Sequence, residues 1–300
     1  MDMTQNKCCR HGASLRRRRR RRRKILRSII FSCSIIAVAV FVAVGSRMIT
    51  SGDGGTNKYD VEAGNNTYDN AVIENSKISE KNKIQNNQSM LDDIMNSTQY
   101  PKQLKELALK NEEALEFVYD YPAEHVKKHT IDLTEEASMD SVPLFVQWDK
   151  RWGYEKYSGN FFAASGCGPT TLSMVVVYLT HNRDASPIAV AKYSKEAGYS
   201  VDGSGSSWTL ISEGCMHYGV KAKAVALDES RMKAELDEGH PIVVNEGPGD
   251  FTDTGHFMVI TGYDDEGFSI NDPNSIEKSG KRWLFRNISS QIRAVWSMYV

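Results

Sequence analysis

The sequence predicts an α+β fold for residues 142–300. Apolar residues recur at helical spacing in the first part of this stretch, and short apolar or β-branched segments fill its last part. Turns rich in glycine and aspartate separate those segments. Helices followed by a run of strands are typical of α+β domains, and about 160 residues suffice for one hydrophobic core.

The first helix of this domain is expected to begin at Gly168 or Pro169 and to end near Leu179. Proline fits the first turn of a helix because its φ is fixed and its missing N–H would be unpaired there in any case. Apolar residues then recur every three or four positions up to Leu179, as they do on a buried helix face. Further helices are expected at 187–196, 209–218 and 229–238.

The C-terminal half is expected to be an antiparallel sheet. Its strands are predicted at 241–244, 257–263, 268–271 and 294–299. These segments are short and consist mainly of apolar, β-branched or aromatic residues. The tight connection "YDDEG" predicts that the second and third of these strands are hairpin neighbours.

Two segments of different composition precede the domain. Residues 48–88 are rich in Asn, Gly, Ser, Asp and Lys, and we expect a flexible linker because so few apolar residues cannot offset the entropy of ordering. Apolar residues recur near helical spacing from Leu104 to Val118, after Pro101. Residues 89–141 are therefore expected to form a helical stalk or a segment that packs on the domain.

The N-terminus has the pattern of a membrane-inserted segment. Residues 1–24 end in an arginine run, Arg16 to Arg23, closed by Lys24, and residues 25–47 contain an apolar stretch typical of one transmembrane helix. The positive-inside rule places the basic tail in the cytoplasm and the rest of the chain outside the cell membrane. A cleavable signal peptide is the alternative, because residues 43–45 resemble a cleavage site. Both interpretations export the domain.

The charge distribution indicates which partners to expect, and the cysteine content indicates whether a disulfide can form. Twelve of the 37 Lys and Arg residues but one of the 38 Asp and Glu residues fall in residues 1–27, so the remainder carries a net charge of −12. A basic run beside an apolar segment favours contact with anionic membrane lipid, and no nucleic-acid partner is expected. In the exported part only Cys167 and Cys215 occur. They either form a disulfide or, as we favour, Cys215 fills a small apolar role.

Cys167 is the candidate nucleophile. It lies in "SGCGPTTLSM", where the predicted helix begins, and the positive end of a helix favours the thiolate over the thiol. The flanking Gly166 and Gly168 allow close backbone packing and leave the sulfur accessible. By itself such a cysteine is as well explained as a small apolar residue at a tight bend.

His256 is the candidate base and Asp272 the residue that orients it. His256 opens a predicted strand after a glycine-rich loop, and Asp272 ends the next strand. Antiparallel neighbours would bring both positions to one end of the sheet, which completes a nucleophile, base and orienter. Asn271 is the second choice for the orienting residue. The amide of Gln147, with the backbone N–H of Cys167, is the candidate donor to a tetrahedral oxyanion.

Five motifs in fixed order carry a resemblance to a known family. The segments "VPLFVQWDKRWGYEKY", "SGCGPTTLSM", "DGSGSSWTL", "GHPIVV" and "GHFMVITGYDDEGFSINDPNS" resemble the papain-like cysteine peptidases related to the bacteriocin (double-glycine) leader peptidases. The resemblance covers residues 142–300. It implies a papain-like fold, with a helical half that carries the nucleophile and an antiparallel sheet that carries the base.

The resemblance also implies roles for the candidate residues. Cys167 matches the nucleophile, His256 the base, Asp272 the orienting carboxylate and Gln147 the oxyanion donor. Gln147 departs from the pattern, since it precedes the cysteine by twenty residues where a few are usual. The chain also lacks the transporter helices and P-loop to which leader peptidases are commonly fused, so the leader substrate does not carry over.

The sequence therefore predicts a bacterial, membrane-tethered, single-pass cysteine peptidase whose domain is extracellular, or secreted if the anchor is cleaved. Its expected partners are peptide or protein substrates, with peptidoglycan stem peptides as one candidate, and membrane lipid. Glu246, Asp250 and Asp253 before His256 favour basic substrates. No metal or organic cofactor is implied. The alternatives are an inactive peptide- or wall-binding module on the same fold and an acyl transferase.

Overall fold

The computed structural model describes residues 66–300, with side chains from residue 78 onward. Residues 70–300 form one unit with a shared set of internal contacts. The expected basic tail at 1–24, the transmembrane anchor at 25–47 and the linker up to residue 65 lie outside the described residues. Among the helices of residues 66–300, none combines the length and the apolar character that crossing a bilayer requires.

The segment before the domain is helical. The chain is helical from Asn66, although a flexible linker is expected up to residue 88. No glycine or proline occurs between residues 65 and 100, so nothing in the backbone interrupts a helix there. The helix expected after Pro101 is broken at Asn111, whose side-chain oxygen accepts from the N–H of Glu113 at 3.0 Å. The elements are α2 (Asn66–Asn96), α3 (Lys102–Lys110), η1 (Glu112–Ala114), α4 (Leu115–Tyr119), α5 (Tyr121–Glu124) and α6 (Thr134–Ser138).

The helical half of the domain is centred on α8 (Cys167–Thr180), which begins one residue before the expected Gly168. Most side chains of α8 are buried on all sides, as in a central core helix. The helix expected over 209–218 is divided at Glu213 into α10 and η2, and Cys215 is buried there as a free thiol, so its apolar role is confirmed. The other elements of this half are α7 (Phe162–Ser165), α9 (Pro187–Glu196), α10 (Thr209–Ser212) and η2 (Gly214–Tyr218).

The C-terminal half is a six-stranded antiparallel sheet in the order β5-β10-β6-β7-β8-β9. The expected antiparallel sheet is confirmed, and β5 and β9 at its two edges were not anticipated. The strands are β5 (Lys221–Ala224), β6 (Ile242–Glu246), β7 (His256–Asp264), β8 (Gly267–Asn271), β9 (Arg282–Trp283) and β10 (Ile292–Tyr299). Between these strands along the chain lie the short helices α11 (Glu229–Asp237), α12 (Ile276–Ser279) and α13 (Phe285–Ile288). Two small hairpins lie outside this sheet. The first is formed by β1 (Lys156–Tyr157) and β2 (Asn160–Phe161), and the second by β3 (Ser200–Val201) and β4 (Gly205–Ser206).

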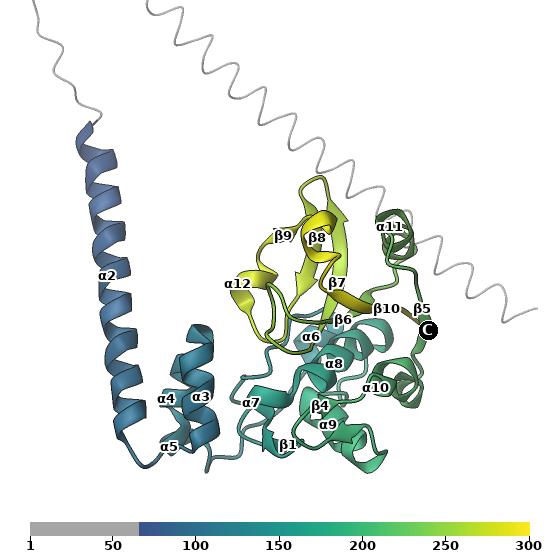
Figure 1. Ribbon diagram of the computed structural model, residues 1–300, viewed down its shortest axis with the longest axis horizontal. Coiled ribbons are helices and arrows are strands. Elements are labelled where there is room, and N and C mark those ends of the chain that lie inside the picture. Colours follow the sequence, from purple (N-terminus) through teal and green to yellow (C-terminus); the bar gives the residue numbers. More distant parts are fainter. Residues whose placement is uncertain (1–65) are drawn as a thin grey trace, which may run out of the picture. The chain divides into compact units, whose positions relative to one another are not determined.

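Helices cover both faces of the sheet. Alternate residues of β7 point to opposite faces, so Phe257 packs in the cluster that contains α8 and Met258 in the cluster that contains α11. Figure 1 shows α8 beside the sheet and α11 at its other side. Because α8 packs on this face of the sheet, its first turn lies against the first residues of β7. The candidate nucleophile and base lie there.

A third apolar cluster joins the preceding helices to the domain. Leu104, Phe117 and Val118 are buried together with Phe161 and Ala163 of the domain. Between the two expectations for residues 89–141, the contacts favour a packing segment over a free stalk.

Candidate active site

Cys167 is the first residue of α8. Burial acts to raise the pKa of its thiol, but the hydrogen bond and positive charge of His256 outweigh this effect, so the pKa is lowered. The backbone N–H groups of Phe257 and Gly168 also donate to the sulfur and favour the thiolate. Part of the residue remains exposed to solvent. Cys167 is thus a half-buried residue with an activated thiol.

The two glycines beside Cys167 are required by close packing. A Cβ on Gly166 would lie 2.6 Å from the carbonyl oxygen of Phe162, and a Cβ on Gly168 would lie 2.5 Å from Oγ of Ser206. Real Cβ atoms do not approach other heavy atoms so closely, and neither site can accept a side chain without movement. The first turn of α8 is therefore wedged between α7 and β4.

His256 and Asp272 meet at one end of the sheet, as hairpin geometry predicts. His256 is the first residue of β7, and Asp272 directly follows β8. Nε2 of His256 lies 2.7 Å from Oδ1 of Asp272, and their side chains are 7% and 1% exposed. Because Nε2 is engaged with the carboxylate, Nδ1 is the ring nitrogen left for the hydrogen bond to Cys167.

Asn271, the alternative orienting residue, is directed elsewhere. Its Nδ2 donates to the carbonyl oxygens of Val142 and Pro143 at 3.1 and 3.0 Å. It therefore fastens the start of the domain to the sheet, and the contact with His256 falls to Asp272.

The electrostatics of the pair favour a charged imidazole beside a thiolate. Burial opposes the charge on His256, but the carboxylate of Asp272 and then Cys167 outweigh it and raise the pKa of the imidazole to about 10. The thiol pKa is lowered and the imidazole pKa is raised, so each group favours the charged form of the other. Such an ion pair is the reactive form of a catalytic cysteine.

Gln147 lies next to the loop after Asp272, but its amide hydrogens are occupied. Its Nε2 donates to the carbonyl oxygen of Ala163 at 2.8 Å and to Oδ1 of Asn274 at 3.3 Å. Its backbone N–H donates to the carbonyl oxygen of Pro273 at 2.7 Å, and its side chain is buried. To act on an oxyanion, the amide would have to give up one of these bonds, so its assigned role stays a prediction.

Glu246 is a buried carboxyl group that sequence reasoning misplaced. It ends β6 directly opposite His256, where side chains share one face of the sheet with Cβ atoms about 5 Å apart. It is fully buried, and neither carboxylate oxygen has a hydrogen-bond partner within residues 78–300. Burial raises its pKa to about 7, although the positive charge of His256 acts in the opposite direction. Glu246 is thus not part of an exposed acidic loop that would attract basic substrates.

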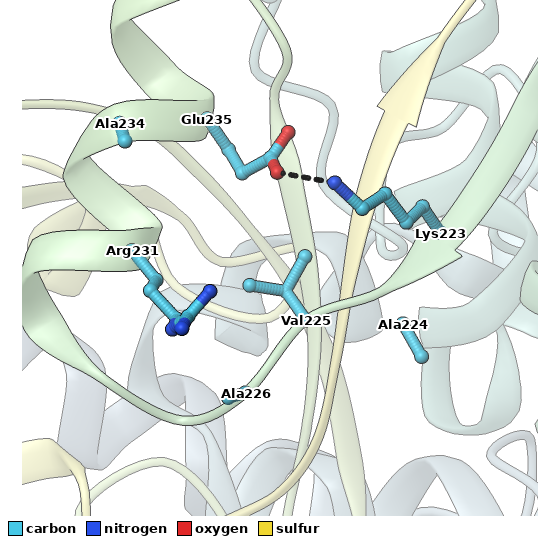
Figure 2. A pocket seen from close by; sticks show the side chains of 7 residues that line it. All are labelled: Lys223, Ala224, Val225, Ala226, Arg231, Ala234 and Glu235. Carbon is cyan, nitrogen blue, oxygen red and sulfur yellow. Dashed lines mark hydrogen bonds and ion pairs between the residues drawn. The ribbon is translucent and has the colours of Figure 1, made fainter.

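A pocket of about 180 Å³ lies between β5 and α11 (Figure 2). Apolar side chains and the ion pair of Lys223 with Glu235, 3.0 Å apart, line it. Strands β10 and β6 separate β5 from β7 in the sheet, so this pocket is not the site of Cys167 and His256.

Comparison with known proteins gives one family match and several similar solved structures. Residues 139–300 match the Peptidase_C39 like family. The crystallised peptidase domain of Streptococcus ComA, a bifunctional ABC transporter involved in a quorum-sensing pathway, is 19% identical, with a TM-score of 0.37 over 45% of this chain and 90% of that chain. A Bacillus anthracis protein described as a C39-like peptidase is 18% identical, with a TM-score of 0.33 over 53% of this chain and 95% of that chain. No curated protein matches the sequence.

Proposed function

The chain belongs to the Peptidase_C39 like family, and from that premise we propose that it is a cysteine peptidase that hydrolyses peptide or amide bonds through Cys167, His256 and Asp272. One observation carries the proposal. Cys167, a half-buried residue at the start of a helix, is hydrogen-bonded through its sulfur to an imidazole whose other nitrogen lies 2.7 Å from a buried carboxylate. That arrangement contains a nucleophile, a base and an orienting group in contact.

In the proposed reaction the thiolate of Cys167 attacks the substrate carbonyl carbon. His256 then gives its Nδ1 proton to the departing amine as the carbon–nitrogen bond breaks, which leaves a thioester. Water attacks the thioester while Nδ1 takes up its proton, and the carbon–sulfur bond breaks to release the acid and the thiolate. Asp272 holds the ring through Nε2 during both steps, so Nδ1 keeps facing the sulfur.

We propose that the backbone N–H of Cys167 and the amide of Gln147 stabilise the tetrahedral oxyanion. The N–H groups in the first turn of a helix have no partner inside the helix, which leaves that of Cys167 available. Gln147 would turn one amide hydrogen from Asn274, its longer contact at 3.3 Å, toward the substrate. Donors fixed before the reaction begins are worth more than donors that must reorganise.

The location that we propose is the outer face of a bacterial cell membrane. The support is the order of basic tail, apolar stretch and acidic remainder in the sequence. Peptides near such a surface, including peptidoglycan stem peptides, are the proposed substrates. A membrane-impermeant thiol reagent applied to intact cells should label Cys167 if the domain is outside. Labelling that requires broken cells would contradict this location.

The activity itself is tested with the full chain and a Cys167→Ala variant. A peptide library that includes stem peptides, read by mass spectrometry, should show new carboxyl termini with the wild type and none with the variant. Iodoacetamide labelling separates the other functions, because an inactive binding module would label slowly and cleave nothing. An acyl transferase would instead yield products that contain a new amide bond.

A further inference from the structure

We propose that Glu113 and Asn111, which precede the family-matched residues 139–300, are positioning residues for the active site. They hold the loop that carries Asp272, and through Asp272 they orient His256. This inference rests on the proposed cysteine-peptidase function. It assigns a role in catalysis to residues that lie outside the part of the chain matched by the peptidase family.

Glu113 is bound to the loop by three hydrogen bonds. Its Oε2 accepts from the backbone N–H of Ile276 at 2.7 Å and of Glu277 at 3.1 Å. Its Oε1 accepts from the hydroxyl of Ser275. Ser275 in turn accepts from the N–H of Lys278 at 3.1 Å, so one carboxylate fixes the whole first turn of α12. Bonds in which the acceptor is ionised are the stronger kind, and the charge of Glu113 is therefore part of the contact.

Asn111 forms a second attachment to the same loop. Its Nδ2 donates to the backbone oxygen of Asn274 at 2.9 Å and to the side-chain oxygen of Asn274 at 3.0 Å. Its own Oδ1 accepts from the N–H of Glu113 at 3.0 Å, which ties the two residues together. Both ends of the 274–277 stretch are thus held by one turn of the preceding segment.

The held stretch is continuous with the proposed catalytic carboxylate. Oδ1 of Asp272 accepts from the N–H of Asn274 at 2.8 Å and lies 2.7 Å from Nε2 of His256. The backbone N–H of Asp272 donates to Ser279 at 2.9 Å at the end of α12. A shift of the loop would therefore move the carboxylate, and the imidazole would lose its fixed orientation toward Cys167.

Glu113→Gln tests the proposal, with Glu112→Gln as the matched control. Glu112 is the neighbouring acid, is exposed, and its Oε1 contacts Asn87 at 2.8 Å and not the loop. We expect Glu113→Gln to lower kcat about tenfold with little change in KM, since substrate contacts remain. In a plot of the rate of Cys167 alkylation against pH, the alkaline limb should move to lower pH. Deuterium exchange of the backbone amides of residues 274–278 should accelerate. Glu112→Gln should leave all three measurements unchanged.

Further variants keep the test decisive. Asn111→Asp places carboxylate oxygens against the oxygens of Asn274 and should produce the same changes, whereas Glu113→Asp keeps the charge and should recover part of the loss. Exchange and alkylation report on the loop and the ion pair without any substrate, so they decide the inference even if no peptide is cleaved. Equal profiles for Glu113→Gln and Glu112→Gln would overturn it.

Discussion

The Cys167–His256 pair predicts an unusual pH dependence of thiol reactivity. His256→Ala removes the positive charge that lowers the thiol pKa, while the burial that raises it remains, so the sulfur should titrate at or above the ordinary thiol value of about 8.5. At pH 6 an ordinary thiol is less than about 1% ionised, and we expect iodoacetamide alkylation of Cys167 to slow about 100-fold. Cys215, buried with its pKa raised to about 11, is an internal control that should stay unlabelled. Matching profiles for wild type and variant would show that the two groups do not form an ion pair.

Gln147→Ala separates an oxyanion donor from a structural amide. If the amide serves the oxyanion, kcat should fall about 100-fold, which is typical for the loss of one such donor. Alkylation of Cys167 passes through no oxyanion, so its rate should stay within about twofold of wild type. A loss of alkylation as large as the loss of kcat would indicate instead that Gln147 only supports Ala163 and Asn274.

Glu246 predicts a fall in stability as pH rises. Its pKa is about 7 in the fold and 4.5 ordinarily, so between these values the folded state binds more protons than the unfolded state. The free energy of unfolding should therefore decrease through this window, by up to about 3 kcal/mol. Glu246→Gln should remove this decrease in urea unfolding curves recorded from pH 4.5 to 8. Glu266→Gln, at an exposed residue, serves as the control. If the free energy of unfolding falls equally with pH in the wild type, Glu246→Gln and Glu266→Gln, the assignment to Glu246 is refuted.

The contact of His256 with Asp272 could be predicted from the sequence because hairpin geometry is local. The approach of Cys167 to His256 is long-range, and its prediction depended on the start of the helix and on the family resemblance. Asp272 was the first choice for the orienting residue and Asn271 the second, and the structure shows Asp272 beside His256 and Asn271 directed elsewhere. Glu246 was read as a loop residue because "NEGPG" contains turn formers. Its burial depends on cross-strand pairing with His256 and on the cover of the sheet, neither of which appears in the local sequence.

At the scale of the element, the first turn of α8 is set by packing more than by helix propensity. Gly168→Ala would stabilise an isolated helix by about 1 kcal/mol. In the protein the new Cβ would lie 2.5 Å from Oγ of Ser206, and such overpacking costs about 1–3 kcal/mol. We therefore expect lower thermal stability, together with a loss of peptidase activity because Cys167 moves with the turn.

A double-mutant cycle shows whether that clash is the cause. Ser206→Gly removes the obstructing side chain, and Tyr157 keeps its other hydroxyl contact with Ser194 at 2.8 Å. Gly168→Ala combined with Ser206→Gly should recover most of the stability and activity that Gly168→Ala alone loses. Additive losses in the double variant would mean that the glycine is required for a different reason.

Elements with a strong pattern were predicted nearly to the residue, and elements held by context were not. Helix α8 has a Gly-Pro pair in its first turn, and α9 and α11 have side-chain N-caps in Ser186 and Asp228. Strands β6, β7, β8 and β10 are rich in β-branched or apolar residues and are bounded by turns. Strand β5 has the sequence "KAKA", which no propensity favours, and it exists because β10 offers a free edge for pairing. Glu213 interrupts the helix expected over 209–218, where a Gly214 follows.

At the scale of the whole molecule, the preceding segment packs on the domain through an apolar cluster of its own. Phe161 shares an apolar cluster with four residues that precede it by more than forty positions, Leu104, Leu107, Phe117 and Val118. Periodicity predicted that this segment is helical, but it does not specify which surface a helix covers. The same limit applies to Glu113, whose contact with Ser275 spans 162 positions.

This packing predicts that a fragment of residues 142–300 is less stable than the longer chain. The fragment uncovers Phe161 and Ala163 and loses the carboxylate of Glu113. Uncovering a large apolar side chain costs about 1.5–3 kcal/mol, and each kcal/mol lowers the unfolding midpoint of a domain of this size by roughly 2–4 °C. Calorimetry should therefore show a midpoint roughly 3–12 °C lower than for residues 78–300, which keep the cluster. Equal midpoints would mean that residues 89–141 are a stalk whose contacts add no stability.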